Sequence, residues 1–233
     1  MTVPLPLVLV PGLLCSARLY GPQVAALWPC GPIMVADHRQ HEQMADIAAD
    51  ILAQAPPRFA LAGLSMGGYI AVAMLRQAPQ RVVKLALLDT SARPDTPEQT
   101  AARQQFIGLA HVGKLNQVVD ALVPRFLHRD RRSDPELNRI IRDMAADTGA
   151  EAFVRQEKAI MSREDARPLL PTIRCPTLVL VGEGDELTPP ELSREIAAAV
   201  PGSRLVIVPD SGHLSTIEKP DAVNAALAEW LRA

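Results

Sequence analysis

The sequence predicts an α/β protein in which a doubly wound, mostly parallel sheet carries a helical cap insertion. Three observations predict it: short unbroken apolar runs recur along the chain, amphipathic helical patterns lie between them, and one long stretch shows helical patterns only. Unbroken apolar runs of roughly four to eight residues are typical of parallel strands buried on both faces, whereas half-exposed strands alternate apolar and polar residues. Strands that alternate with helices favour an open sheet whose ligands bind at the carboxyl ends of its strands.

Six apolar runs are the predicted strands. The first ten residues contain neither a positively charged segment nor a small-residue cleavage site, so we interpret them as a strand and not as a secretory signal. No apolar stretch approaches the roughly 18 residues that a membrane-spanning helix needs. The predicted strands are Leu5 to Val10, Ile33 to Ala36, Phe59 to Ala62, Val82 to Leu88, Thr177 to Val181 and Leu205 to Val208.

Helical spacing follows in the segments between and after these runs. Apolar residues recur every three or four positions from Met44 to Leu52, and again from Val223 to Leu231. From Ser91 to Leu170 no strand pattern occurs, and the helical spacing is repeated twice. We therefore predict a core formed by residues 1–90 and 171–233, and a helical cap formed by residues 91–170 that lies over the functional edge of the sheet.

Composition excludes several classes of function. The chain has 24 basic and 26 acidic residues among 233, and aromatic residues make up only 3% of it, so we expect neither a nucleic-acid partner nor an anionic membrane surface. Three scattered cysteines without a C-x-x-C pair favour a reducing cytoplasm. His38 and His41 have an H-x-x-H spacing but no third ligand at metal spacing, so we expect no metal site.

The segment G-L-S-M-G-G places Ser65 between Gly63 and Gly67, directly after an apolar run and before a helical pattern from Tyr69 to Gln77. A sharp turn from strand to helix forces the serine into a strained backbone conformation, and the residues two before and two after it must lack bulky side chains. We therefore predict that Ser65 is an exposed nucleophile at the carboxyl end of a strand.

A serine nucleophile needs a base, and the base needs an acid that orients it. His213, in P-D-S-G-H-L-S, follows the last predicted strand, and Asp185, in V-G-E-G-D-E-L, follows the strand before it. Asp89 is a second candidate for the acid because it also follows a strand, whereas Asp210 is too near His213 in sequence to orient its ring. The chain order of nucleophile, acid and histidine is that of α/β-hydrolases.

The chain resembles a small α/β-hydrolase-fold protein over nearly its whole length. The resemblance rests on V-L-V-P-G-L-L after the first strand, on G-L-S-M-G-G, on P-T-L-V-L-V-G-E-G-D-E-L-T-P-P and on S-G-H-L-S-T-I-E-K-P. It implies an oxyanion hole made by the backbone N–H groups of Leu13 and Met66. Pro11 stands where many relatives carry a histidine, and Gln40 stands where they often carry a glycine, which affects how these two loops are braced.

These motifs predict a cytoplasmic serine hydrolase without a cofactor, a monomer or homodimer acting on a small-molecule ester, thioester or lactone. Ser65, Asp185 and His213 would be its catalytic residues. The same residues also serve acyl transfer, carbon–carbon bond hydrolysis, elimination or perhydrolysis in similar proteins, and some similar proteins only bind a ligand. Four apolar residues of the predicted cap are expected to line the pocket: Phe106, Leu109, Leu122 and Phe126.

Overall fold

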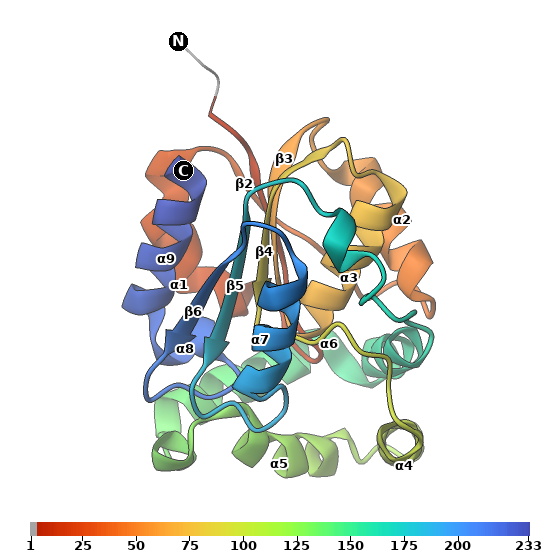
Figure 1. Ribbon diagram of the computed structural model, residues 1–233. Helices are drawn as coiled ribbons and strands as arrows, with labels where there is room; N and C mark the ends of the chain where they lie inside the picture. Colours follow the sequence, from red (N-terminus) through yellow and green to blue (C-terminus); the bar gives the residue numbers. More distant parts are fainter. Residues whose placement is uncertain (1–3) are drawn as a thin grey trace.

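A six-stranded parallel sheet organises residues 4–233, the part of the chain that the computed structural model describes (Figure 1). Its strands follow the order β2-β1-β3-β4-β5-β6, and every neighbouring pair is parallel. All six predicted strands are present, with ends shifted by at most two residues, although residues 1–3 lie outside the described part. The strands are β1 (Leu7–Val10), β2 (Ile33–Val35), β3 (Phe59–Leu64), β4 (Val82–Leu88), β5 (Thr177–Gly182) and β6 (Arg204–Val208).

The unbroken apolar runs arise because both faces of the sheet are covered. In β1, Leu7 and Leu9 pack into the apolar cluster on one face, while Val8 and Val10 pack into the cluster on the other. Successive strand residues point to opposite faces, so a strand buried on both sides must be apolar at every position. The doubly wound parallel sheet predicted from the sequence is therefore confirmed.

Helices form a layer on each face of the sheet (Figure 1). The helix after β3 begins at Met66, three residues earlier than its apolar pattern predicts, because the turn at Ser65 leads directly into it. On one face lie α1 (Gly21–Leu27), α8 (Ser215–Glu218) and α9 (Pro220–Arg232); on the other lie α2 (Met44–Gln54), α3 (Met66–Gln77) and α7 (Pro190–Ala199).

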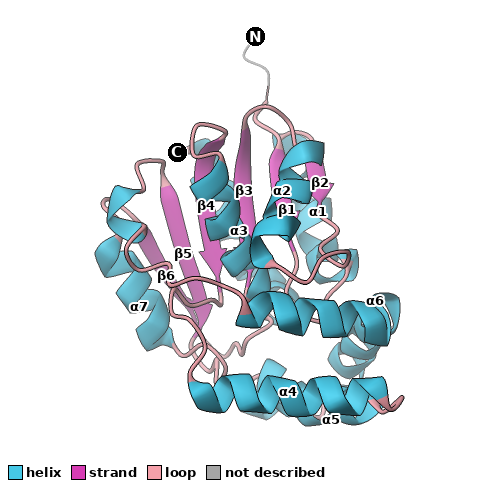
Figure 2. Ribbon diagram, turned by 90° about the vertical axis from the view of Figure 1, so that its right-hand side faces the viewer, coloured by secondary structure: helices cyan, strands magenta, loops and turns pink. Residues whose placement is uncertain are grey.

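Three further helices occupy the connection between β4 and β5. They are α4 (Pro97–His111), α5 (Leu115–Phe126) and α6 (Pro135–Met161), and Figure 2 shows them beyond the carboxyl ends of the strands. Gly149, with φ of 75°, interrupts the helical geometry of α6. Apolar residues of α5 and α6 share one cluster with residues of the sheet, so the division into a core and a separate cap at residues 91 and 170 stays a prediction.

Four 3₁₀ turns complete the connections, and they are short. They are Ala17–Tyr20, Trp28–Cys30, Arg129–Arg131 and Leu170–Thr172. Across residues 4–233, no helix has both the length and the apolar character required to cross a bilayer.

The strand order places a crevice at the ends of β1 and β3. The chain moves outward from β1 to β2 and then returns to the other side of β1 with β3, so the connections after β1 and β3 leave in opposite directions. Ligands of open α/β sheets bind at such a reversal point, outside the carboxyl ends of the strands. Leu13 follows β1 and Ser65 follows β3, so both flank this crevice.

Replacing Gly67 by alanine is expected to lower the free energy of unfolding by at least about 3 kcal/mol. The added methyl group would lie 2.0 Å from the carbonyl oxygen of Val10, a backbone atom that cannot move without disturbing β1. The matched control is Gly108→Ala in α4, where the methyl group meets nothing within 4 Å and is expected to stabilise the helix by about 0.5–1 kcal/mol. Urea unfolding measures both changes, and a Gly67→Ala protein as stable as the wild type would contradict this packing.

Candidate active site

Ser65 stands at the turn between β3 and α3 in a strained backbone conformation, with φ of 55° and ψ of −115°. Its N–H donates to the carbonyl oxygen of Leu88 at 2.9 Å, and its own carbonyl oxygen accepts the hydroxyl of Thr90 at 2.8 Å. Non-glycine residues adopt such positive φ values at an energetic cost, and they do so where neighbouring groups fix the conformation. The end of β4 therefore holds the turn that presents Ser65.

The glycines around Ser65 are required by backbone contacts. A Cβ atom at Gly63 would lie 2.1 Å from the carbonyl oxygen of Gly67. A Cβ atom at Gly68 would lie 2.5 Å from the Thr90 hydroxyl, the same group that binds the Ser65 carbonyl. The sequence predicted the need for small residues here, but it gave no indication that Thr90 is the group that excludes a side chain at Gly68.

His213 and Asp185 form a buried pair. The imidazole Nδ1 donates to Asp185 Oδ2 at 2.8 Å, and the two side chains are 3% and 0% exposed. Asp185 Oδ1 also accepts the backbone N–H groups of Leu187 and Thr188, at 2.8 and 2.9 Å, and the Thr188 hydroxyl donates to Oδ2 at 2.7 Å. Asp185 thus holds the ring by Nδ1, and these further hydrogen bonds fix the carboxylate itself.

Charges within the pair shift both titrations toward the ionised forms. Burial by itself lowers the pKa of His213, but the charge of Asp185 and the hydrogen bond to it outweigh this effect, so the pKa lies above its ordinary value. Burial likewise raises the pKa of Asp185, but the charge of His213 and the hydrogen bonds from His213 and Thr188 bring it below the ordinary value. The site therefore stabilises an imidazolium next to a carboxylate.

Asp89, the second candidate for the acid, binds other groups. Its carboxylate is fully buried, accepts the N–H of Gly182 at 2.8 Å and is hydrogen-bonded by the hydroxyl of Ser215. Burial and the nearby charge of Asp185 raise the pKa of Asp89 well above its ordinary value. Because its oxygens contact the end of β5 and the segment after His213, Asp89 joins the two loops that carry Asp185 and His213.

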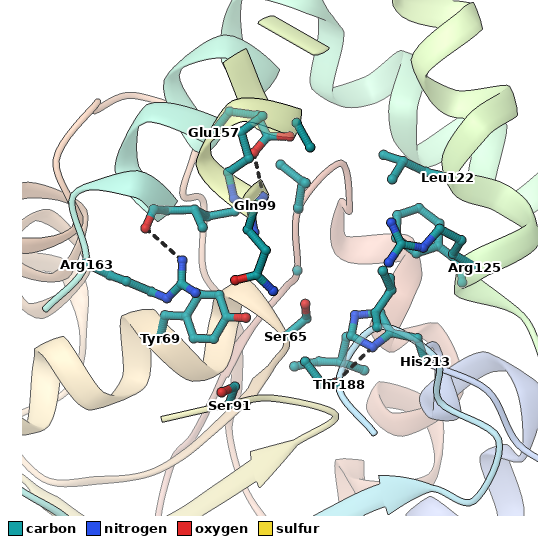
Figure 3. A pocket seen from close by; sticks show the side chains of 18 of the residues that line it. Ser65, Tyr69, Ser91, Gln99, Leu122, Arg125, Glu157, Arg163, Thr188 and His213 are labelled. Atoms are coloured by element: carbon teal, nitrogen blue, oxygen red, sulfur yellow. Dashed lines mark hydrogen bonds and ion pairs between the residues drawn. The ribbon is translucent and has the colours of Figure 1, made fainter. Parts of the chain in front are cut away.

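Ser65 and His213 line one cavity of about 280 Å³ beneath α4, α5 and α6 (Figure 3). Within residues 4–233 no hydrogen bond joins the Ser65 hydroxyl to the imidazole. Phe106, Leu122 and Phe126 line the cavity as predicted. The prediction for Leu109 is wrong, because this side chain packs against the apolar cluster and does not reach the cavity.

The loop after β1 forms the wall opposite the Ser65 turn. Leu13 lines the cavity, and in the described part of the chain neither its N–H nor that of Met66 donates to a protein acceptor. His38 Nε2 donates to the Gly12 carbonyl at 2.9 Å, and the N–H of Leu14 donates to Gln156 Oε1 at 3.1 Å. A histidine beyond β2 and a glutamine of α6 therefore brace this loop, and a single polar residue in a helical pattern gave no signal for the latter.

An ionic network forms a polar wall of the cavity, and the sequence gave no sign of it. The network consists of Asp95, Arg103, Glu157 and Arg163. Arg103 contacts Asp95 and Glu157, each at 2.7 Å, and Arg163 contacts Asp95 at 2.7 Å. Burial raises the pKa of Glu157, and the charge of Arg103 opposes that shift. Such buried charges are tolerated because each has an oppositely charged partner.

Cys15 also lines the cavity, and all three cysteines are free thiols. Complete burial raises the pKa of Cys15 to about 12, so the group stays protonated and unreactive near neutral pH. In residues 4–233 no three His, Cys, Asp or Glu side chains are grouped as a metal site would require.

The fold and this arrangement of residues define the class of protein. A parallel sheet that presents a strained serine at the end of β3, with a histidine and an acid after later strands, is the framework of the α/β-hydrolases. A sequence model of the alpha/beta hydrolase family matches residues 7–226. The chain belongs to this family of enzymes.

Curated and solved relatives cover most of the chain. It is 31% identical to the protein named non-heme bromoperoxidase BpoC of Mycobacterium tuberculosis, over 80% of this chain and 73% of that protein. It is 28% identical to a pimeloyl-[acyl-carrier protein] methyl ester esterase of Neisseria meningitidis, over 90% of this chain and 70% of that protein.

Two solved structures superpose along the whole chain. A malate-bound thermophilic esterase from Thermogutta terrifontis has a TM-score of 0.90 and 32% identity, covering 100% of this chain and 91% of the esterase. The enol-lactonase of Burkholderia xenovorans LB400 has a TM-score of 0.91 and 30% identity, covering 100% of this chain and 93% of the lactonase. These likenesses support the fold class independently of the motifs.

Replacing Asp185 by asparagine is expected to lower the pKa of His213, because the charge that raises it is removed while the ring stays buried. An NMR titration of the imidazole measures this pKa in the wild type, where it should exceed 6.5. The control is Asp210→Asn, which removes an exposed carboxylate three residues from His213 and should leave the titration in place. Equal His213 titrations in the wild type and the Asp185→Asn protein would show that the pair does not exist in solution.

Proposed function

We propose that this enzyme is a serine hydrolase that cleaves a small ester, thioester or lactone through an acyl-enzyme on Ser65, with His213 and Asp185 as base and acid. The observation that carries the proposal is that Ser65, in a strained turn, lines the same cavity as an imidazole whose Nδ1 is held by Asp185 at 2.8 Å. Nδ1 is occupied by this bond, so Nε2 is the nitrogen available to the serine hydroxyl.

In the first half of the proposed reaction, Ser65 Oγ attacks the carbonyl carbon of the substrate while His213 Nε2 takes the hydroxyl proton. Asp185 stabilises the imidazolium, and the N–H groups of Leu13 and Met66 bind the developing oxyanion. Collapse of the tetrahedral intermediate breaks the bond to the leaving group, which takes the proton from His213. In the second half, His213 deprotonates a water molecule that attacks the acyl-enzyme, and the proton returns to Ser65 as the acid leaves.

The size of the cavity supports a small substrate. A volume of about 280 Å³ lies at the lower limit of cavities that hold drug-sized ligands, which is roughly 300 Å³. The relatives named as an esterase, a methyl ester esterase and an enol-lactonase support cleavage of a carboxylic ester or lactone. Three free cysteines support a reducing compartment, and we place the enzyme in the cytoplasm as a monomer or homodimer.

Perhydrolysis is a second candidate, favoured by the likeness to BpoC, which is named as a bromoperoxidase. Hydrogen peroxide would replace water in the second half of the reaction, and the acyl group would leave as a peracid. Adding peroxide to the ester assay and measuring peracid distinguishes the two candidates, since a hydrolase forms only the carboxylic acid.

Ser65→Ala is expected to abolish labelling by a fluorophosphonate probe and to reduce turnover of p-nitrophenyl acetate by at least about 1,000-fold, because the nucleophile is removed. The matched control is Ser91→Ala, which removes the other serine hydroxyl that lines the cavity and should leave labelling intact. Full turnover by the Ser65→Ala protein would rule out the acyl-enzyme.

The pH profile of kcat/KM is expected to have an acid limb with an apparent pKa above 6.5, because His213 must be neutral to take a proton and its pKa is raised. Activity should therefore fall as the pH decreases through that value. In Asp185→Asn the limb should move to lower pH, while kcat falls by about 1,000- to 10,000-fold. A limb at the same pH in both proteins would assign the titration to another group.

A further inference from the structure

The charged groups that line the cavity are mostly guanidiniums. Four arginines line it, Arg93, Arg103, Arg125 and Arg163, whereas Glu157 is the one lining carboxylate in the described residues. A cavity with this composition attracts anions unless each arginine already has a carboxylate partner. The partners of the four arginines therefore decide whether the cavity carries free positive charge.

Three of the four guanidiniums have partners, and the fourth has none. Arg103 and Arg163 belong to the ionic network, and Arg93 contacts Glu195 at 2.9 Å. No carboxylate oxygen lies within 4 Å of the Arg125 guanidinium in residues 4–233, and no hydrogen bond from its side chain to any of these residues occurs. Arg125 is thus the cavity-lining cation whose donors are all available to a ligand.

Arg125 is held next to His213 by its chain neighbour Phe126. The ring of Phe126 stacks on the imidazole with a centroid distance of 6.1 Å and an interplanar angle of 15°, and its carbonyl oxygen accepts the N–H of Leu214 at 3.1 Å. The N–H of His128 donates to Glu218 at 2.9 Å. These contacts fix the end of α5 on the loop that carries His213, and Figure 3 shows Arg125 above His213.

The opposite requirement holds for the rest of the lining near Arg125. Leu122, Leu187 and Leu192 line the cavity with apolar side chains, so a short hydrocarbon chain fits between the serine and the cation. A guanidinium presents a planar set of donors that matches the two oxygens of a carboxylate. The cavity therefore has an apolar passage with a free cation beside it.

We propose that Arg125 binds a carboxylate at the far end of the acyl group, and that the substrate is a monoester of a short dicarboxylic acid or a lactone that bears a carboxylate. This inference rests on the proposed function, because Ser65 must attack the ester carbonyl while Arg125 holds the anionic end. Arg125 is then a specificity-determining residue that distinguishes a charged acyl group from a neutral one of equal length.

The test compares p-nitrophenyl hydrogen adipate with p-nitrophenyl hexanoate, which differ in the presence of a terminal carboxylate. The wild type is expected to hydrolyse the adipate ester with a kcat/KM about 10-fold higher, and Arg125→Gln should remove this preference without changing kcat/KM for the hexanoate more than about twofold. Arg125→Lys should retain part of the preference. Raising the salt concentration to about 1 M should also reduce it, because the Debye length shortens to about 3 Å.

The matched control is Arg129→Gln, which removes a nearby guanidinium that is 77% exposed and does not line the cavity. It should leave both esters unaffected. Equal kcat/KM values for the two esters in the wild type, or an equal loss of both in Arg125→Gln, would overturn the inference and leave the proposed hydrolase intact.

Failure of the proposed function has a different signature. It would appear as hydrolysis that survives Ser65→Ala, or as no hydrolysis of either ester. Calorimetric titration with adipate itself then still decides the Arg125 site, because the inference requires binding to the wild type, at least about 10-fold weaker binding to Arg125→Gln, and weaker binding of hexanoate than of adipate. Equal binding of adipate by the two proteins, or no binding by either, would overturn it.

Discussion

The close approach of α3 to the ends of β1 and β3 is the constraint on which the rest of the site depends. The Cβ position of Gly67 falls within 2.0 Å of the Val10 carbonyl oxygen, so only glycine allows the helix to begin this near to the sheet. That approach forces Ser65 into positive φ, and the bonds to Leu88 and Thr90 keep it there. The strain of the turn is thereby offset by contacts with three parallel strands and does not need to be relieved by a change in the serine.

Electrostatics in the site follow from burial without water. Asp185 and Asp89 lie close enough for the charge of each to affect the other, yet their surroundings push their pKa values in opposite directions. Asp185 has an imidazole and a hydroxyl as donors, so its charge is favoured, whereas Asp89 is fully buried and has only neutral donors. Two neighbouring carboxyl groups with separated pKa values typically have different tasks. Here one orients the histidine, and the other joins the loops that carry the pair.

The helices between β4 and β5 contribute more than a cover. Gln156 of α6 braces the loop that holds Leu13, and the ionic network forms a cavity wall from residues of α4 and α6 together with residues that flank these helices. α5 places Phe126 against His213 and Arg125 at the cavity. The same helices therefore support the proposed oxyanion loop, limit the size of the cavity and set its charge. Substrate selection by the proposed reaction depends on this layer, whereas the bond-breaking groups come from the sheet.

The sequence by itself determined the six strands, the helical character of residues 91–170 and the positions of Ser65, Asp185 and His213 at carboxyl strand ends, because apolar period and glycine spacing report local backbone requirements. Only the tertiary structure decided that Asp89 binds Gly182 and Ser215, that Leu109 turns away from the cavity and that Gln156 reaches Leu14. It also decided that Arg125 has no partner while Arg103 has two. The reason is that these contacts, or their absence, join groups far apart in the chain, and no local pattern specifies which donors and acceptors folding brings within hydrogen-bond distance.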